Sequence, residues 1–69
     1  MNWSVIQVDW INFKDKVRTN WVKLTDEDIT RIAGRREELI GRLRVRYGFA
    51  KAEAGREVEA WVRSQRHAA

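Results

Sequence analysis

Arginine carries the clearest chemistry in this chain of 69 residues. Four arginines in the central part recur at helical spacing, and they share one face if the central helices are nearly collinear. Guanidinium groups arranged in this way can contact phosphates, with a strong dependence on salt. The other interpretation is a solvated face whose arginine stems cover the core. The residues of this arginine stripe are Arg31, Arg35, Arg42 and Arg46.

Two further arginine contacts are expected within or beside this stripe. Glu38 precedes Arg42 by one helical turn, and an acid and a base at this spacing pair on a helix surface. Arg36 falls near the middle of an apolar stripe, so we expect it to pair with a carboxylate at the edge of the fold.

Residue types that catalyse reactions are scarce and scattered. Ser4 is interpreted as a helix cap, and Ser64 has no neighbouring base in the sequence to activate it. The single histidine, His67, stands alone and cannot build a metal site. No cysteine is present, which excludes disulfides and thiolate ligands. We therefore predict no catalytic, cofactor-binding or metal-binding residues and no enzymatic activity.

An acidic cluster follows Thr25 and has a structural explanation. The Thr25 hydroxyl can accept from the backbone N–H of Asp28, and the Asp28 carboxylate can reach back, which makes a capping box. Asp26, Glu27 and Asp28 then lie in a first helical turn, where the helix dipole favours negative charge. The spacing of a calcium-binding loop is absent. A helix is therefore expected to begin here.

The segment after this cap contains a buried stripe that glycines divide. Gly34 predicts a short helix followed by a longer one, although the sequence leaves open whether the two are continuous. Gly48 can take the left-handed conformation that ends a helix. Gly41 lies inside the longer helix, where it costs about 1 kcal/mol relative to alanine, so we expect a neighbouring helix to approach closely there. The stripe comprises Ile29, Ile32, Leu39, Ile40, Leu43 and Tyr47.

The N-terminal third predicts one long helix that begins at Ser4, with Gln7 as its capping partner and Trp3 as a hydrophobic staple. Its aromatic seam could stack the bases of a single strand. A domain this small, however, needs its indoles for the core, so we expect them to be buried. The seam consists of Ile6, Trp10, Phe13, Val17, Trp21 and Leu24.

Three apolar residues lie off this seam: Val8, Ile11 and Val22. On one helix, with about 100° per residue, they fall together on a second face. Exposed apolar residues that gather on one surface are typical of a contact with another protein or a second copy. We call this set the predicted partner face.

The remaining residues complete the predicted fold. After Ala50 a last helix begins without a hydroxyl cap, and its buried stripe is Ala54, Val58, Trp61 and Val62. We expect an all-α bundle of four helices, arranged as two hairpins that pack across one another. Residues 1–66 are predicted to form the single domain, and residues 67–69 a mobile tail.

Composition and targeting signals favour the cytoplasm. Fourteen basic and ten acidic residues give a net charge of +4, which permits nucleic-acid binding but does not require it. The N-terminus lacks the basic and apolar regions of a secretory signal. No apolar run approaches the roughly 20 residues of a membrane span.

Several segments together carry a family pattern: M-N-W, K-D-K-V, W-V-K-L-T-D-E-D-I, I-A-G-R-R-E-E-L-I-G-R-L and R-Y-G-F-A-K-A-E-A. In them the chain resembles the CsbD-like family of small bacterial stress proteins, from Met1 to about Trp61. The resemblance implies a SAM-domain-like fold of two orthogonal helical hairpins and induction in general stress responses. It supplies no catalytic residues. Val8, Asp15 and Val22 depart from the family pattern, which often has glycine there.

The sequence thus predicts a non-enzymatic bacterial stress-response protein that acts as a protein-interaction or protective module, with no cofactor. The alternative function is binding of a nucleic-acid backbone through the arginine stripe.

Overall fold

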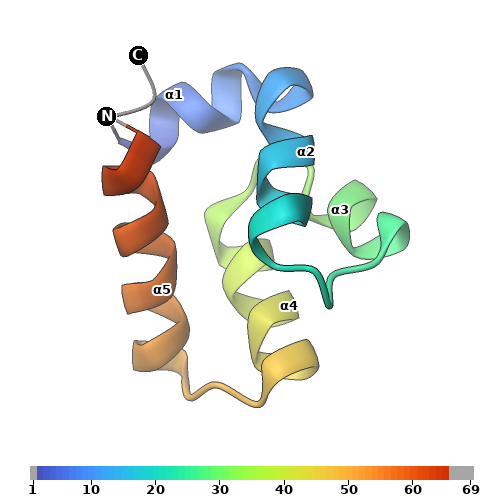
Figure 1. Ribbon diagram of the computed structural model, residues 1–69, viewed down its shortest axis with the longest axis vertical. Coiled ribbons are helices and arrows are strands. Elements are labelled where there is room, and N and C mark those ends of the chain that lie inside the picture. Colours follow the sequence, from blue (N-terminus) through green and yellow to red (C-terminus); the bar gives the residue numbers. More distant parts are fainter. Residues whose placement is uncertain (1, 66–69) are drawn as a thin grey trace.

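Helices joined by short turns make up the whole described chain (Figure 1). The computed structural model describes residues 2–65, and no strand occurs within that range. The predicted all-α fold is confirmed, but the described range holds five helices where four were expected. The predicted tail, residues 67–69, and His67 lie outside the described residues. The helices are α1 (Trp3–Val8), α2 (Trp10–Asn20), α3 (Asp26–Ile32), α4 (Arg36–Tyr47) and α5 (Lys51–Ser64).

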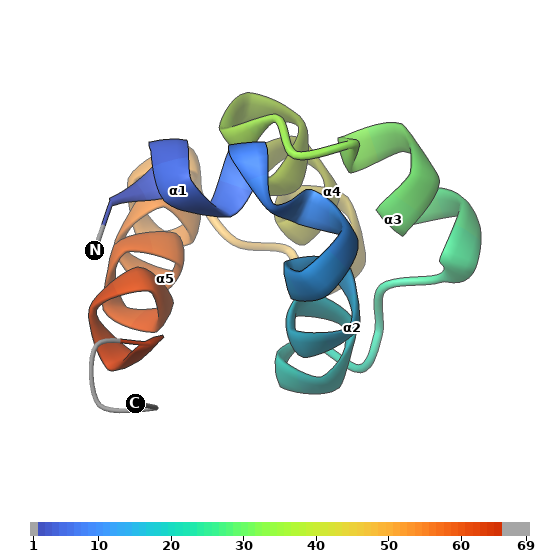
Figure 2. The same cartoon turned by 90° about the horizontal axis from the view of Figure 1, so that it is seen from above.

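The extra helix arises because the predicted N-terminal helix is broken at Asp9. The backbone of Asp9 has φ −108° and ψ 38°, outside the α-helical region, and α1 turns there to bridge the ends of α2 and α5 (Figures 1 and 2). The expected cap at Ser4 is wrong, because α1 begins at Trp3 after Asn2. The turn carries Trp3 back over the bundle, where its Nε1 donates to the carbonyl oxygen of Gly34 at 2.9 Å.

The core is one cluster of apolar side chains, with Trp61 at its aromatic centre. The ring of Trp61 lies 5.5 Å from that of Trp21, 6.3 Å from that of Phe13 and 6.4 Å from that of Trp3. Trp21 and Trp61 are buried as predicted, whereas Trp10 is half-buried and packs against the core. The buried apolar residues are Ile6, Phe13, Val17, Trp21, Leu24, Ile29, Ile32, Leu39, Ile40, Leu43, Ala54, Val58, Trp61 and Val62.

The signals in the central segment act as predicted, with one exception. Thr25 and Asp28 form the capping box of α3, and Gly48 ends α4 with φ +73°. Gly34, with φ +80°, separates α3 from α4. The close approach expected at Gly41 is wrong, because no atom of a neighbouring element lies within 4 Å of where its Cβ would be. Close approach occurs at Gly34, where a Cβ would lie 3.3 Å from the carbonyl oxygen of Gln7 in α1.

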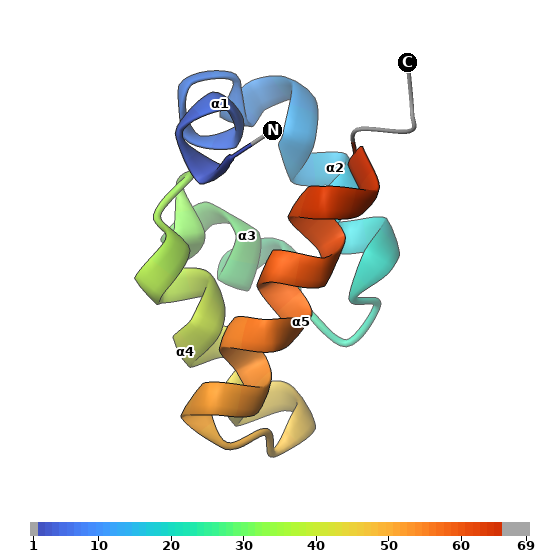
Figure 3. The ribbon, with the colours of Figure 1, turned by 90° about the vertical axis from the view of Figure 1, so that its left-hand side faces the viewer.

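The most extensive packing contact joins α4 and α5, which run side by side from the short turn at residues 48–50 (Figures 1 and 3). On its other side α4 packs against α3. Among residues 2–65, no helix combines the length and apolar character needed to cross a bilayer. The two orthogonal hairpins implied by the family resemblance stay a prediction.

Candidate functional site

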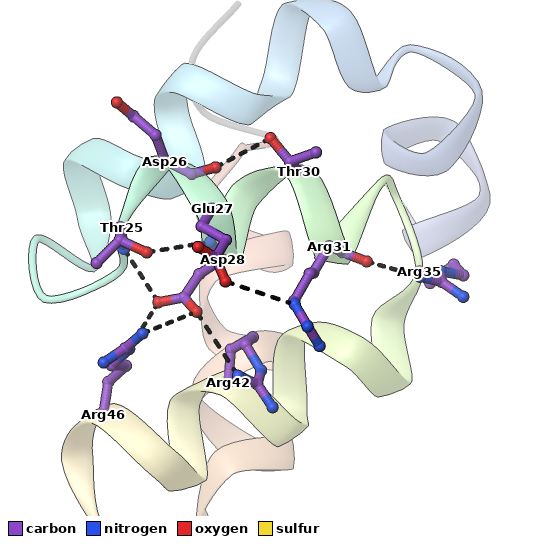
Figure 4. A network of polar contacts seen from close by, with 9 residues as sticks. All are labelled: Thr25, Asp26, Glu27, Asp28, Thr30, Arg31, Arg35, Arg42 and Arg46. Atoms are coloured by element: carbon purple, nitrogen blue, oxygen red, sulfur yellow. Dashed lines mark hydrogen bonds and ion pairs between the residues drawn. The ribbon is translucent and has the colours of Figure 1, made fainter.

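Half of the predicted arginine stripe converges on one buried carboxylate. Asp28, in the first turn of α3, is only 1% exposed. Its two oxygens accept from Arg46 Nε at 2.7 Å and from Arg46 Nη2 at 3.1 Å, which makes a bidentate pair. Arg42 Nη1 lies 3.7 Å from the same carboxylate. Figure 4 shows both arginines of α4 pointing toward α3. These two members of the stripe therefore join α4 to α3.

The same carboxylate also caps α3. The backbone N–H of Thr25 donates to Asp28 Oδ2 at 3.0 Å, and the backbone N–H of Asp28 donates to the Thr25 hydroxyl at 3.1 Å. The hydrogen bond from Arg46, the largest cause, and those from Thr25 outweigh the cost of burial and lower the pKa of Asp28 to about 2. The same hydrogen bond raises the pKa of Arg46. Asp28 is therefore ionised at neutral pH, and its charge pairs with that of Arg46.

The other two stripe residues lie on the exposed side of the α3–α4 turn. Arg31 Nε is 3.9 Å from a carboxylate oxygen of Glu27, and both side chains are well exposed. Arg35 donates from Nη2 to the carbonyl oxygen of Arg31 at 2.7 Å. The four arginines therefore do not present one common outward face, because two of them turn inward toward Asp28. Their role in phosphate binding stays a prediction.

Two expected ion pairs have different outcomes. Arg36 pairs with Glu59 of α5 at 3.0 Å, as predicted for a carboxylate at the edge of the fold. The expected pair of Glu38 with Arg42 is wrong, because the guanidinium of Arg42 turns to Asp28; among residues 2–65 no ion pair involves Glu38. Spacing along one helix could not reveal this choice, since Asp28 comes from another helix.

All three residues of the predicted partner face are exposed, but they do not share one helix. Val8 is 90% exposed at the end of α1, Ile11 is 74% exposed in α2, and Val22 is 79% exposed beyond the end of α2. The 11 residues of α2 extend for about 16 Å. A partner that contacts all three side chains must therefore reach along the whole of α2.

A shallow groove continues the partner face between α2 and α3. Ile11 forms part of its wall, and Val8 lies three residues earlier in the chain, before the break at Asp9. The groove has a volume of about 380 Å³ and a mainly apolar lining. Exposed apolar side chains beside an apolar groove can bury surface only against another molecule. We call it the α2–α3 groove, and its lining residues are Trp10, Ile11, Lys14, Ile29, Thr30 and Ala33.

Metal-ligating side chains do not gather in the described part of the chain. Within residues 2–65, no group of three or more His, Cys, Asp or Glu side chains is placed to hold a metal ion. The buried Asp28 is occupied by Arg46 and Thr25. The candidate functional surfaces are therefore the apolar groove and the exposed arginines.

Known proteins similar to this chain share one family name. The chain is 47% identical over 53 residues to the UPF0337 protein YjbJ of Escherichia coli, a match that covers 77% of each chain. It is 44% identical over 61 residues to the UPF0337 protein ECA0631 of Pectobacterium atrosepticum, over 88% of each. The chain belongs to the UPF0337 family. A UPF0337 protein of Nitrosomonas europaea, NE2439, is 36% identical over 62 residues, which are 90% of this chain and 66% of that relative.

The names of these UPF0337 proteins assign no activity to them. No family model matches the chain. No solved structure matches it.

Proposed function

We propose that this UPF0337 protein is a CsbD-like stress-response protein of the cytoplasm, without enzymatic activity, that binds another protein. The contact surface is the pair Val8 and Ile11 together with the α2–α3 groove, and a partner that reaches along α2 also covers Val22. The observation that carries this proposal is the exposed Ile11 in the wall of an apolar groove, with the exposed Val8 three residues earlier in the chain.

The energetics favour a role for these side chains outside the fold. Burial of a valine or isoleucine side chain contributes about 1.5–3 kcal/mol. Val8 and Ile11 contribute little of this to the folded monomer, because they are 90% and 74% exposed. Covering both with a partner therefore gives about 3–5 kcal/mol before the costs of association are subtracted. That is one part of the free energy of a reversible complex, to which burial of the α2–α3 groove adds.

The proposal is tested with a double variant, Val8→Lys with Ile11→Lys. We expect wild type to retain a partner in a pull-down, or to form a dimer in sedimentation, and the double variant to lose that interaction. Val45→Lys is the matched control, because Val45 is also exposed, at 61%, but lies on α4. Identical sedimentation and identical retained proteins for wild type and the double variant would contradict the proposal.

The stress-response part of the proposal has its own test. The resemblance to CsbD-like proteins supports it, and the membership in UPF0337 is consistent with that resemblance. We expect the abundance of the protein to rise when the organism that encodes it meets a general stress, such as entry into stationary phase. Constant abundance through several stresses would contradict this part and leave the contact surface as a separate question.

Phosphate-backbone binding by the arginine stripe is the alternative proposal. The exposed side chains of Arg31 and Arg35 support it, whereas the engagement of Arg42 and Arg46 by Asp28 counts against it. We expect a variant with Arg31→Gln and Arg35→Gln to bind DNA or RNA more weakly than wild type at low salt. Absence of any binding by wild type at low salt would remove this alternative.

A further inference from the structure

A second groove lies on the outer face of α4, away from the α2–α3 groove. It has a volume of about 470 Å³. Gly41 and Gly48 are two helical turns apart, so they lie on the same side of α4, with the exposed Val45 between them. We call it the α4 groove, and its lining residues are Gly41, Arg42, Arg44, Val45, Gly48 and Phe49.

Part of the groove wall is backbone without a side chain, at Gly41 and Gly48. Packing within the chain does not require a glycine at position 41. Glycine is a poorer helix former than alanine in a helix interior. A Cβ at Gly41 would nevertheless meet no atom of a neighbouring element within 4 Å, and the same holds at Gly48. Gly48 is needed for its left-handed backbone, φ +73°, whereas Gly41 is helical. The space beside Gly41 is therefore open to the groove on the outer surface.

The exposed side chain of Arg44 forms part of the groove wall. Three of the four arginines of α4 are paired: Arg36 with Glu59, and Arg42 and Arg46 with Asp28. Arg44 is exposed, and within residues 2–65 it forms no ion pair. It is thus the member of α4 whose charge is available to an anion.

One aromatic ring, that of Phe49, forms part of the groove lining. The ring of Phe49 stacks on that of Tyr47, with centroids 5.3 Å apart and planes at 11°. Both rings are half-buried. The ammonium group of Lys23 lies 5.1 Å from the centroid of the Tyr47 ring. Within the groove itself the aromatic ring is Phe49 and the exposed cation is Arg44. An aromatic ring beside a basic group is a combination that binds single-stranded nucleic acids.

We propose that the α4 groove binds a short stretch of single-stranded nucleic acid. A phosphate lies against Arg44, and an unstacked base lies over the bare backbone at Gly41 and against Phe49. The last carbonyl oxygens of a helix have no intrahelical donor, so those just before Gly48 can accept from the N–H groups of a base. A duplex keeps its base faces stacked inside and cannot use this arrangement. The site shares no residue with the proposed protein-contact surface.

The first experiment measures fluorescence anisotropy of labelled oligothymidine and oligouridine of about 12 nucleotides, at about 20 and 200 mM salt. We expect wild type to bind either strand more tightly than the matching duplex. Arg44→Gln is expected to weaken binding about 5-fold and to reduce the log–log salt slope by about 0.7. Arg56→Gln is the control, because Arg56 is an exposed arginine of α5 outside the groove, and its effect is expected to stay below about 2-fold.

A second pair of variants separates binding from folding. Gly41→Ala is expected to raise the melting temperature by about 4–8 °C, because alanine favours the helix and meets no neighbour. Gly41→Gln also favours the helix but fills the groove, so it is expected to weaken binding about 5-fold or more. A loss of affinity together with a gain in stability cannot come from misfolding.

Four results would overturn the proposal. They are no binding of either strand at low salt, equal loss for Arg44→Gln and Arg56→Gln, duplex binding as tight as single-strand binding, and unchanged affinity in Gly41→Gln. The Val8→Lys, Ile11→Lys variant is expected to bind the oligonucleotides like wild type. The protein-contact proposal and the nucleic-acid proposal can therefore fail independently of each other.

Discussion

Replacing Asp28 with asparagine removes the charge on which two arginines of α4 converge. The substitution preserves the size of the side chain and one amide oxygen that can still accept from the Thr25 backbone N–H. It leaves Arg46 and Arg42 beside a neutral group in place of a carboxylate at 2.7 and 3.7 Å. We expect the junction of α3 and α4 to be weakened while the helices persist.

The size of the effect follows from the pKa of Asp28. That pKa falls from an ordinary 3.8 to about 2 in the folded protein, which corresponds to about 2.5 kcal/mol in favour of the ionised form. The side chains of Arg46 and Arg42 are 38% and 26% exposed, so water screens part of this interaction. We therefore expect Asp28→Asn to lower the free energy of unfolding by about 2 kcal/mol. A domain of this size has about 3–5 kcal/mol in total.

Urea denaturation followed by tryptophan fluorescence measures this loss, and its pH dependence tests the cause. Because folding depresses the pKa of Asp28, its contribution is complete above pH 3.8 and is lost as the pH falls toward 2. Wild type and Asp28→Asn should therefore differ by a constant amount from pH 7 to about pH 5 and converge below pH 3.8.

Asp26→Asn is the matched control, since Asp26 lies in the same first turn but its side chain is 78% exposed in its pair with Arg18. We expect it to cost less than about 1 kcal/mol. The reasoning is refuted if Asp28→Asn costs no more than Asp26→Asn, or if the difference from wild type persists unchanged at pH 2.

Three further predictions concern the turns that hold α1, α3 and α4 together, each measured by urea or thermal unfolding. Gly34→Ala is expected to cost about 2 kcal/mol, because φ is +80° and the new Cβ would lie 3.3 Å from the Gln7 carbonyl oxygen; Gly48→Ala, with φ +73° and open space, should cost about 1 kcal/mol. Equal costs would contradict the close approach of α1. Trp3→Phe removes the hydrogen bond to the carbonyl of Gly34 and should cost about 1–2 kcal/mol, so an unchanged stability would count against that contact. Thr25→Ala removes the hydroxyl acceptor at the start of α3 and should cost about 1 kcal/mol, and no change would argue against the capping box.

Features that depend on local chemistry could be predicted from the sequence. The capping box at Thr25 and the helix end at Gly48 involve neighbouring residues only, and both were found. The spacing of three and four residues predicted burial well, because a helix presents such positions to one side. Trp10 and Tyr47 are the exceptions in being half-buried.

Features that depend on which helices meet could not be predicted in this way. Asp9 is neither glycine nor proline, yet the helix breaks there, and the break allows Trp3 to contact Gly34 and Trp61. The pairing of Arg46 with Asp28 joins residues 18 positions apart on different helices. Helical spacing could define a stripe of arginines, but only the packing of α3 on α4 decides that two of them turn inward.

Site-specific photocrosslinking tests the central claim, a protein partner on the α1–α2 side, most directly. A photoreactive benzophenone side chain is placed at Ile11 in one variant and at the exposed Val45 of α4 in another, and each is irradiated inside stressed cells. The account predicts a discrete crosslinked protein, or a crosslinked dimer, from position 11 that is absent from position 45. No adduct at position 11, or the same adducts from both positions, would contradict it.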